Sequence, residues 1–356
     1  MKRIVLTGGG TAGHVTPNIA LLPRLQELGY DVHYIGSYEG IERKLIEELD
    51  IPYYGIASGK LRRYFDIKNF TDPFRVIHGY SQAKHLIKSL QPDVVFSKGG
   101  FVSVPVVKAA AKYKIPAIIH ESDMTPGLAN RLSIPNAWKV CCNFPETLNY
   151  LPSEKAALTG SPIRRELLSG DKIRAVDFCG LSLNKPTILV IGGSLGAASV
   201  NKAVRQNLPE LLKKYQIIHL CGKDKLDESL KKTNGYVQYE YIKKELADLF
   251  ALADLVISRA GANAICELLA LRKPNLLIPL SAKASRGDQI LNAKSFEKQG
   301  FSKVLDEDTM TDEMFLAAVE EVYENRQAYV KTMTQSEQTN SVEKVIQLIE
   351  EACAGK

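Results

Sequence analysis

Two glycine-rich segments, each placed just after a short apolar run, have the composition of phosphate-binding loops. The first is residues 8–14, GGGTAGH, and the second is residues 192–196, GGSLG. Glycines let a backbone approach a diphosphate closely, and the start of a following helix offers free N–H groups and positive potential. The plainer alternative is that the glycines only let a strand and a helix pack together. Two such segments favour two phosphate-bearing ligands, as in transfer from a nucleotide-activated donor to a phosphorylated acceptor.

The first segment also matches the GxGxxG pattern of dinucleotide-binding proteins, at Gly8, Gly10 and Gly13. A nicotinamide or flavin site usually has an acidic residue about 20 residues further on, at the end of the second strand, to bind the ribose. The second predicted strand instead ends at residues 35–37, Ile-Gly-Ser, and no acid follows until Glu39. The pattern therefore favours a diphosphate ligand that carries no nicotinamide.

The elements that would position these segments are short apolar runs that alternate with stretches of helical periodicity. The runs are residues 4–7, 32–35, 94–96, 117–120, 187–191, 217–221, 237–241, 255–258 and 275–279. Such alternation is typical of parallel sheets covered by helices, and ligands bind there beyond the carboxyl ends of the strands. The predicted fold class is α/β, with two Rossmann-like, doubly wound parallel-sheet domains facing a cleft.

The length of 356 residues suits two domains, because single hydrophobic cores stop growing beyond a few hundred residues. We expect one domain over residues 1–160 and a second over residues 161–340, with the boundary near Gly160-Ser161-Pro162. The helical tail from Asp312 onward is expected to reach back to the first domain.

The composition excludes several classes of protein. Hydrophobic residues make up 45% and charged residues 24%, which argues against disorder and against a membrane bundle. The six cysteines form no CxxC pair and no zinc-site spacing, so we expect reduced thiols. No signal peptide and no window of about 18 uncharged apolar residues occurs, which predicts a cytoplasmic protein. The net charge of +6 favours anionic partners.

Six segments in order resemble the MurG family of bacterial glycosyltransferases, which belongs to glycosyltransferase family 28. They are GGGTAGHVTPNIAL (residues 8–21), SKGGFVSVP (97–105), HESDMTPGLANR (120–131), GSPIR (160–164), IGGSLGAASVN (191–201) and SRAGANAICEL (258–268). The resemblance covers essentially the whole chain and implies the two-domain GT-B architecture. It also implies inverting transfer of N-acetylglucosamine from UDP-N-acetylglucosamine to the muramyl sugar of undecaprenyl-pyrophosphoryl-muramyl-pentapeptide (lipid I), giving lipid II for peptidoglycan synthesis.

The resemblance implies which residues contact the donor. Arg164 and Ser194 would meet its diphosphate, the backbone of Ile242 its uracil, Glu267 its ribose and Gln289 its sugar hydroxyls. From sequence alone Glu267 is equally a solvated helix carboxylate. Asp123 stands where other members carry Asn, and Asp288 where some carry a second Gln. The full expected donor set is Thr11, Ala12, Gly13, Asp123, Arg164, Ser194, Ile242, Ala262, Asn263, Ala264, Glu267 and Gln289.

The acceptor diphosphate is expected at Gly10, Thr11 and His14, and the transfer needs a base to take the proton of the muramyl hydroxyl. Two residues are candidates. His14 titrates near neutrality when unperturbed, and Glu121 ends a predicted buried strand where desolvation would raise its pKa. His14 is alternatively a capping group or a diphosphate ligand, and Glu121 a loop anchor. The sequence does not rank the two.

We expect no cofactor and no obligatory metal. No DxD-type acidic pair lies in a convincing metal-binding loop, and Arg164 with two helix amino termini could neutralise the departing UDP instead.

A basic and aromatic segment, residues 60–88, predicts contact with an anionic membrane surface. Its net charge is +5, and cationic residues meet headgroups while aromatic ones enter the acyl boundary. A helix core face is the alternative for Phe70, Phe74 and Ile77, and the pattern also occurs in nucleic-acid binders, but no other feature indicates a nucleic-acid partner. We place the protein peripherally at the cytoplasmic face of the membrane, through Arg62, Arg63, Phe65, Lys68, Phe70, Phe74 and Arg75.

Three rival functions remain open at this stage. A nucleotide-sugar epimerase would share the architecture and the UDP site without needing the basic segment. Another GT-B lipid glycosyltransferase would differ in its acceptor, and a non-catalytic sensor would bind UDP-N-acetylglucosamine without turnover.

Overall fold

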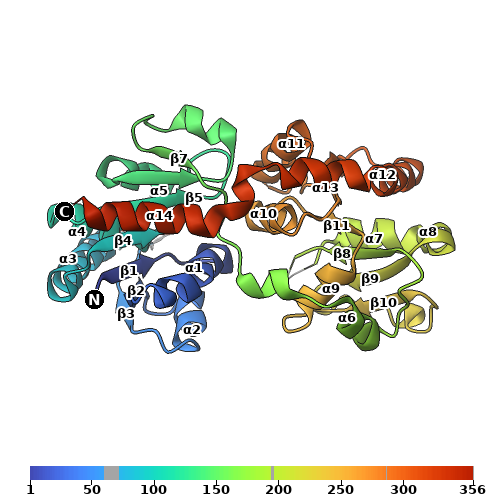
Figure 1. Cartoon of the computed structure of the whole chain (residues 1–356), viewed down its shortest axis with the longest axis horizontal. Helices are drawn as coiled ribbons and strands as arrows, with labels where there is room; N and C mark the ends of the chain where they lie inside the picture. The colour runs from blue at the N-terminus through green and yellow to red at the C-terminus, as the bar shows by residue number, and fades with distance from the viewer. Residues whose placement is uncertain (60–71, 194–195, 286, 356) are drawn as a thin grey trace. The chain divides into compact units, whose positions relative to one another are not determined.

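The computed structural model describes residues 1–59, 72–193, 196–285 and 287–355, which form two compact units (Figure 1). Unit 1 comprises Met1–Arg164 and Asn340–Lys356, and unit 2 comprises Arg165–Thr339. Each unit is a parallel sheet with helices packed against it, so the predicted α/β fold class of two doubly wound domains is confirmed.

Among the described residues, unit 1 contains a seven-stranded parallel sheet in the order β3-β2-β1-β4-β5-β6-β7. The side chains of the central strands β1 and β4 are almost entirely buried and apolar, as expected where helices cover both faces. The order reverses between β1 and β4, which makes their carboxyl ends the expected ligand site. The strands are β1 (Arg3–Thr7), β2 (Asp31–Ser37), β3 (Tyr53–Ile56), β4 (Val94–Ser97), β5 (Ala117–Glu121), β6 (Lys139–Cys142) and β7 (Ala156–Leu158).

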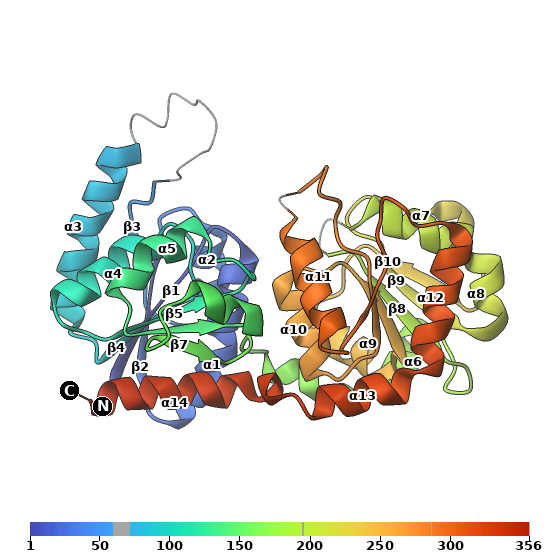
Figure 2. The ribbon, with the colours of Figure 1, turned by 90° about the horizontal axis from the view of Figure 1, so that it is seen from above.

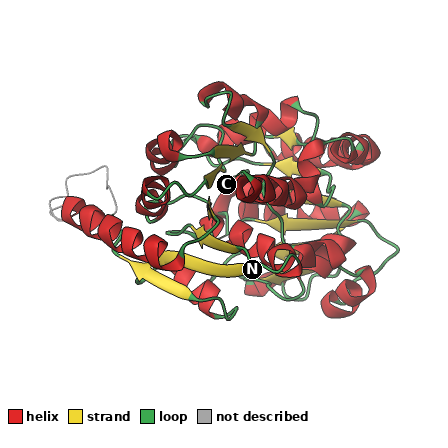
Figure 3. Cartoon of the chain, turned by 60° about the vertical axis from the view of Figure 1, so that its left-hand side comes forward, coloured by secondary structure: helices red, strands yellow, loops and turns green. Residues whose placement is uncertain are grey.

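Alternate residues of β1 face two different cores. Ile4 and Leu6 pack with α1 and α14, whereas Val5 packs with α3 and α4. Figure 2 shows α14 running alongside this sheet, although it follows unit 2 in the chain, and Figure 3 shows strands lying between helices. The helices of unit 1 are α1 (Thr16–Glu27), α2 (Ile41–Glu47), α3 (Asp72–Leu90), α4 (Ser103–Lys112), α5 (Leu128–Ser133) and α14 (Ser341–Ala354).

Unit 2 repeats the arrangement with six parallel strands among its described residues, in the order β10-β9-β8-β11-β12-β13. The order reverses between β8 and β11. The strands are β8 (Thr187–Ile191), β9 (Gln216–Leu220), β10 (Tyr236–Tyr239), β11 (Leu255–Ser258), β12 (Asn275–Leu277) and β13 (Lys303–Val304). The helices are α6 (Lys172–Cys179), α7 (Ala198–Gln206), α8 (Leu208–Lys214), α9 (Leu246–Leu252), α10 (Ala262–Ala270), α11 (Asp288–Lys298), α12 (Asp312–Glu324) and α13 (Arg326–Thr334).

The helices after Asp312 divide between the two units. Helices α12 and α13 belong to unit 2, and α14 alone returns to unit 1, where Val345, Ile346 and Ile349 are buried. None of the helices in the described part of the chain is both long and apolar enough to cross a membrane.

Candidate functional site

Two glycine loops meet at the carboxyl ends of β1 and β4 in unit 1. The backbone N–H of Gly9 donates to the carbonyl of Gly99 at 3.3 Å. A Cβ added to Gly100 would lie 2.3 Å from the carbonyl oxygen of Gly9, and Gly100 has a φ of +86° that disfavours other residues. The close approach of the two loops therefore requires glycine at position 100.

A buried glutamate that the sequence did not single out braces the first glycine loop. Glu42, in α2, accepts a hydrogen bond from the N–H of Gly10 at 3.1 Å through Oε2 and from the N–H of Ser37 at 3.1 Å through Oε1. Glu42 thus joins the loop after β1 to the end of β2. No acid lies at the end of β2, where a dinucleotide site would use one for the ribose, and the carboxylate of Glu42 is engaged with the backbone.

His14 ends the short 3₁₀ helix Ala12–His14 that follows the loop, and its ring is held in one orientation. Its Nδ1 lies 2.9 Å from the carbonyl oxygen of Gly9 and 3.2 Å from Oγ1 of Thr11. Because a carbonyl can only accept, Nδ1 carries the proton and the Nε2 lone pair can accept one. Burial lowers the pKa of His14 below its ordinary value, and the nearby charge of Lys98 lowers it further. The ring is therefore neutral at pH 7.

Glu121, at the end of β5, is buried and accepts three hydrogen bonds. Its Oε1 accepts from the N–H of Asp123 at 2.9 Å, and its Oε2 accepts from the N–H of Gly127 at 2.9 Å and from Nδ2 of Asn130 at 2.8 Å. Burial raises the pKa of Glu121, against the effect of these bonds. The carboxylate is turned toward the loop of residues 122–127, which is the geometry of a loop anchor.

Lys98 links the loop after β4 to the loop after β5. Its side chain is buried, and its Nζ lies 2.7 Å from Nδ1 of His120 and 2.7 Å from Oγ of Ser122. The Nε2 of His120 lies 2.8 Å from the carbonyl oxygen of Gly160, so Nε2 carries the proton and Nδ1 accepts from the ammonium. Burial and the charge of Lys98 hold the pKa of His120 well below its ordinary value. A cation is thus fixed beside the glycine loops.

The unit 2 site begins where the amino termini of α7 and α10 follow adjacent strands, β8 and β11. Neither the residue before α7, Ala197, nor the residue before α10, Gly261, caps its helix with a side chain. Both helix amino termini therefore bring positive potential to this edge of the sheet, which favours an anion there. The loop is tight, because a Cβ on Gly196 would lie 1.8 Å from the carbonyl oxygen of Cys221. Ser194 lies outside the described residues.

Three predicted donor contacts differ in their surroundings. Arg164 is the last residue of the first segment of unit 1, and among the residues that the structure describes none accepts a hydrogen bond from its buried Nε. Ile242 is buried and follows β10 after two residues, the half-buried Glu240 and the exposed Tyr241. Glu267 is half-buried and lies in α10, whose first turn holds the other predicted contacts, Ala262, Asn263 and Ala264.

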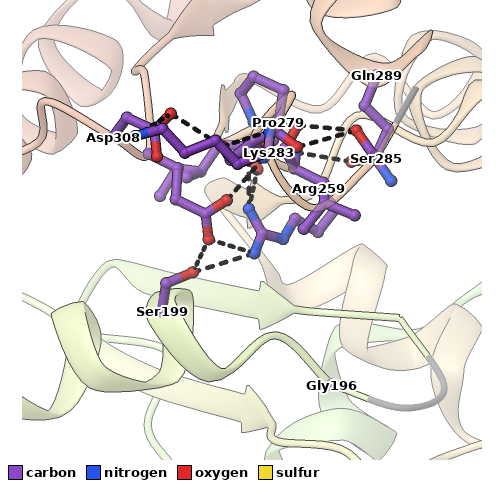
Figure 4. A network of polar contacts seen from close by, with 12 residues as sticks. Gly196, Ser199, Arg259, Pro279, Lys283, Ser285, Gln289 and Asp308 are labelled. Carbon is purple, nitrogen blue, oxygen red and sulfur yellow. Dashed lines mark hydrogen bonds and ion pairs between the residues drawn. The ribbon is translucent and has the colours of Figure 1, made fainter. Parts of the chain in front are cut away.

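Gln289 lies in the first turn of α11, and its amide is already partly oriented. Its Oε1 accepts a hydrogen bond from the N–H of Leu280 at 3.1 Å. This bond leaves the two N–H groups of Nε2 as the donors that the predicted sugar contact would use. Figure 4 shows Gln289 at one side of a polar network that contains Arg259, Ser199, Lys283, Ser285 and Asp308.

No group of three or more His, Cys, Asp or Glu side chains in the described ranges could hold a metal ion. The predicted donor and acceptor residues supply backbone N–H groups, hydroxyls, amides, a guanidinium, an imidazole and the carboxylates of Asp123 and Glu267.

Most of the residues predicted to contact a membrane lie outside the described part of the chain. Arg62, Arg63, Phe65, Lys68 and Phe70 lie outside the described residues, and so does the side chain of Phe74. On the described part of α3, Arg75 is exposed and Ile77 is 67% exposed. Ile77 is therefore not part of a helix core face, and the alternative interpretation is wrong for this residue. The core side of α3 is formed by Ala83 and Ile87 instead.

Both units match models of one protein family. Residues 4–141 match the glycosyltransferase family 28 N-terminal domain, and residues 187–349 match the glycosyltransferase family 28 C-terminal domain. A protein of Lachnoclostridium phytofermentans named UDP-N-acetylglucosamine--N-acetylmuramyl-(pentapeptide) pyrophosphoryl-undecaprenol N-acetylglucosamine transferase is 70% identical over 351 residues, with 99% of both chains covered.

Two solved structures resemble the chain as a whole. The crystal structure of Acinetobacter baumannii MurG is 28% identical, with a TM-score of 0.76 over 99% of this chain and 100% of that one. UDP-GlcNAc 2-epimerase from Methanocaldococcus jannaschii is 13% identical, with a TM-score of 0.68 over 99% and 100%. At that identity the second resemblance concerns the fold alone.

Proposed function

This chain belongs to glycosyltransferase family 28, and we infer from that premise that it is an N-acetylglucosaminyltransferase. It moves N-acetylglucosamine from UDP-N-acetylglucosamine to the muramyl sugar of undecaprenyl-pyrophosphoryl-muramyl-pentapeptide, in peptidoglycan synthesis. The observation that carries this conclusion is the 70% identity over 351 residues with a relative named for that transfer. The epimerase alternative is supported by fold alone, at 13% identity.

Unit 2 is proposed to bind the donor. The uncapped amino termini of α7 and α10 supply N–H groups and positive potential for the diphosphate, and Arg164 and Ser194 add charge-assisted and hydroxyl bonds. The buried Nε of Arg164 supports this role, because a phosphate oxygen would give it an acceptor. Ile242 is assigned to the uracil, Glu267 to the ribose and Gln289 to the sugar.

Unit 1 is proposed to bind the acceptor diphosphate at Thr11 and beside Gly10, whose own N–H already donates to Glu42, and to supply the base. The muramyl hydroxyl oxygen attacks the anomeric carbon, its proton passes to Nε2 of His14, and UDP leaves with the electrons of the broken bond. The bound proton on Nδ1 and the lowered pKa both favour a neutral ring that can accept a proton. A neutral ring adds no charge to diphosphate binding, so we assign His14 as the base.

Glu121 is assigned as a positioning residue. Its three hydrogen bonds hold the loop that carries Asp123, which is proposed to face the donor sugar. Lys98 supplies a fixed positive charge beside the same loops.

A transfer assay tests the function directly. We expect the chain, given labelled UDP-N-acetylglucosamine and a short-chain lipid I analogue, to form a labelled disaccharide product. Without the acceptor we expect no substantial UDP release, whereas an epimerase would act on the donor alone. Binding of the donor without any product would favour a sensor and contradict the assignment.

No metal is proposed to take part, because Arg164 and the two helix amino termini can stabilise the charge of departing UDP. The same assay in excess EDTA is expected to keep its full rate. Loss of product in EDTA, restored by a divalent ion, would contradict this.

Peripheral attachment to an anionic membrane is proposed for the segment of residues 60–88, which carries a net charge of +5. The exposed Arg75 and Ile77 on α3 support it, because both side chains could contact a lipid surface without being withdrawn from the hydrophobic core.

Reversing three of these charges is expected to release the protein from vesicles. The triple change Arg62→Glu, Arg63→Glu, Lys68→Glu should weaken binding to anionic vesicles by at least about a hundredfold, since each basic residue contributes roughly 1 kcal/mol. Co-sedimentation at low salt measures the bound fraction. The matched control reverses three exposed lysines of unit 2, Lys172, Lys223 and Lys232. Equal binding by both triple variants would overturn the assignment of the surface.

A further inference from the structure

A buried ion pair joins three loops of unit 2 at the carboxyl edge of its sheet. Arg259 directly follows β11, and Glu307 lies shortly after β13. Nη2 of Arg259 lies 2.6 Å from Oε1 of Glu307, and their side chains are only 12% and 14% exposed. Burial alone would raise the pKa of Glu307, but hydrogen bonds from Arg259, Ser199 and the N–H of Ser281 hold it below its ordinary value. The carboxylate is therefore ionised.

The remaining contacts of the pair reach two other segments, as Figure 4 shows. Nη1 of Arg259 donates to the carbonyl oxygens of Ile278 and Pro279 at 3.0 and 3.1 Å. Nη2 of Arg259 donates at 3.0 Å to Oγ of Ser199 in the first turn of α7, and this hydroxyl also donates to Glu307. Oε2 of Glu307 accepts from the N–H of Ser281 at 2.9 Å. One pair thus contacts α7 and the segment after β12.

The segment after β12 leads directly to Gln289. Leu280, between the carbonyl of Pro279 and the N–H of Ser281, donates its own N–H to Oε1 of Gln289 at 3.1 Å. Oγ of Ser285 donates to the carbonyl of Ser281 at 3.0 Å and accepts from the N–H of Gly287 at 3.1 Å, just before α11. The position of the Gln289 amide therefore depends on residues 279–281, which Arg259 and Glu307 hold.

We propose that Arg259 and Glu307 are positioning residues that hold the sugar-contacting amide of Gln289 in register with the amino termini of α7 and α10. The inference rests on the proposed function and deepens it. The pair fixes the distance between the part of the site that binds diphosphate and the part that binds sugar. It therefore contributes to the preference for the nucleotide sugar over UDP, which has no sugar to contact.

The charge of Glu307 is central to this arrangement. A glutamine in its place keeps the shape and one acceptor oxygen, but it leaves the guanidinium of Arg259 buried without its counter-charge. We expect the segment after β12 to shift relative to α7, while the helix amino termini themselves stay in place. Binding to the sugar should suffer most, because preorganised contacts lose affinity when their supports move.

The test is a calorimetric titration of the full chain with UDP-N-acetylglucosamine and, separately, with UDP. For Glu307→Gln we expect the affinity for UDP-N-acetylglucosamine to fall about tenfold, the size of one lost hydrogen bond, and the affinity for UDP to change less than about twofold. Ser199→Ala is a milder change, which removes the hydroxyl that contacts both Arg259 and Glu307. It should also lower the affinity for UDP-N-acetylglucosamine relative to the affinity for UDP.

The matched control is Asp248→Asn. Asp248 also pairs with an arginine, Arg174 at 2.6 Å, and also accepts from a backbone N–H, that of Asp171 at 2.7 Å, but it joins α9 to α6. We expect Asp248→Asn to lower the melting temperature without changing the ratio of the two affinities. The inference would be overturned if Glu307→Gln lowered the affinities for both ligands equally or lowered neither. It would also be overturned if Asp248→Asn changed the ratio of the two affinities in the same way.

If Glu307→Gln fails to fold, Ser199→Ala tests the positioning role through the same ratio of affinities for UDP-N-acetylglucosamine and UDP. Titration of the unaltered chain distinguishes a failure of the proposed function from a failure of the positioning role alone. If it does not bind UDP-N-acetylglucosamine, the proposed function falls and this inference falls with it. If it binds and is active while the variants keep its ratio, only the positioning role is wrong.

Discussion

His14→Ala is expected to lower kcat by about a thousandfold, within the range that a general base contributes. The loss follows from the geometry, because the ring is fixed through Nδ1 and leaves Nε2 to take the proton. The measurement is the steady-state rate of disaccharide formation at saturating donor and acceptor. A small change in kcat with a large rise in the acceptor KM would contradict the assignment and favour a diphosphate ligand.

The pH dependence gives an independent check of the same residue. A base must be unprotonated, so kcat/KM falls as the pH drops through the pKa of His14. Because burial and then Lys98 lower that pKa, we expect this acid limb below about 6.5. Lys98→Met removes the nearby positive charge and should move the limb upward. An unchanged limb in Lys98→Met would count against His14 as the titrating group.

Glu121→Ala is expected to destabilise unit 1 by about 3 kcal/mol or more. The change leaves the buried Nδ2 of Asn130 and the partly buried N–H groups of Asp123 and Gly127 without their acceptor, at about 1–3 kcal/mol for the buried donor and less for each of the other two. Trp138, the single tryptophan of the sequence, lies in unit 1, so its fluorescence during urea unfolding reports on this unit. An unchanged transition would show that Glu121 does not anchor the loop.

Glu121→Gln separates anchoring from proton transfer. The amide keeps one acceptor and most of the loop contacts, so an anchor should retain the acid limb of the pH profile and lose less activity than His14→Ala. Had Glu121 been the base, the acid limb would vanish and kcat would fall as far as in His14→Ala. Comparing the two variants ranks the residues that the sequence left equal.

The central strands were predictable because their side chains are buried on both faces. β1, β4, β5, β8 and β11 all read as short continuous apolar runs, and each prediction is confirmed. The edge strands β3 (Tyr-Tyr-Gly-Ile), β7 (Ala-Ala-Leu) and β13 (Lys-Val) are short and mostly half-buried, so none of them gives a long and strongly apolar run. When a strand this short is only partly buried, its hydrophobic pattern is too weak to identify it as a strand.

Loop residues were predictable where they directly follow a strand, but the polar pairs that hold the loops were not. Glu42 lies 32 residues from Gly10, and Glu307 lies 48 residues from Arg259. No local spacing marks such pairs. One signal was nevertheless present, because Lys98 and Arg259 each directly follow the strand beside the point where the sheet order reverses. A cation in the same place in both halves indicates a common need for positive charge there.

The return of α14 to unit 1 affects the order in which the chain can fold during synthesis. Unit 2 is continuous, from Arg165 to Thr339, and can complete its core as soon as that stretch has left the ribosome. Unit 1 begins first but lacks Val345, Ile346 and Ile349, which pack with Ile4 and Leu21, until residues 341–354 emerge. Domains usually mature from the amino terminus onward. Here the unit that carries His14 is finished last, so a nascent chain acquires the proposed donor domain before the proposed base is set in a completed core.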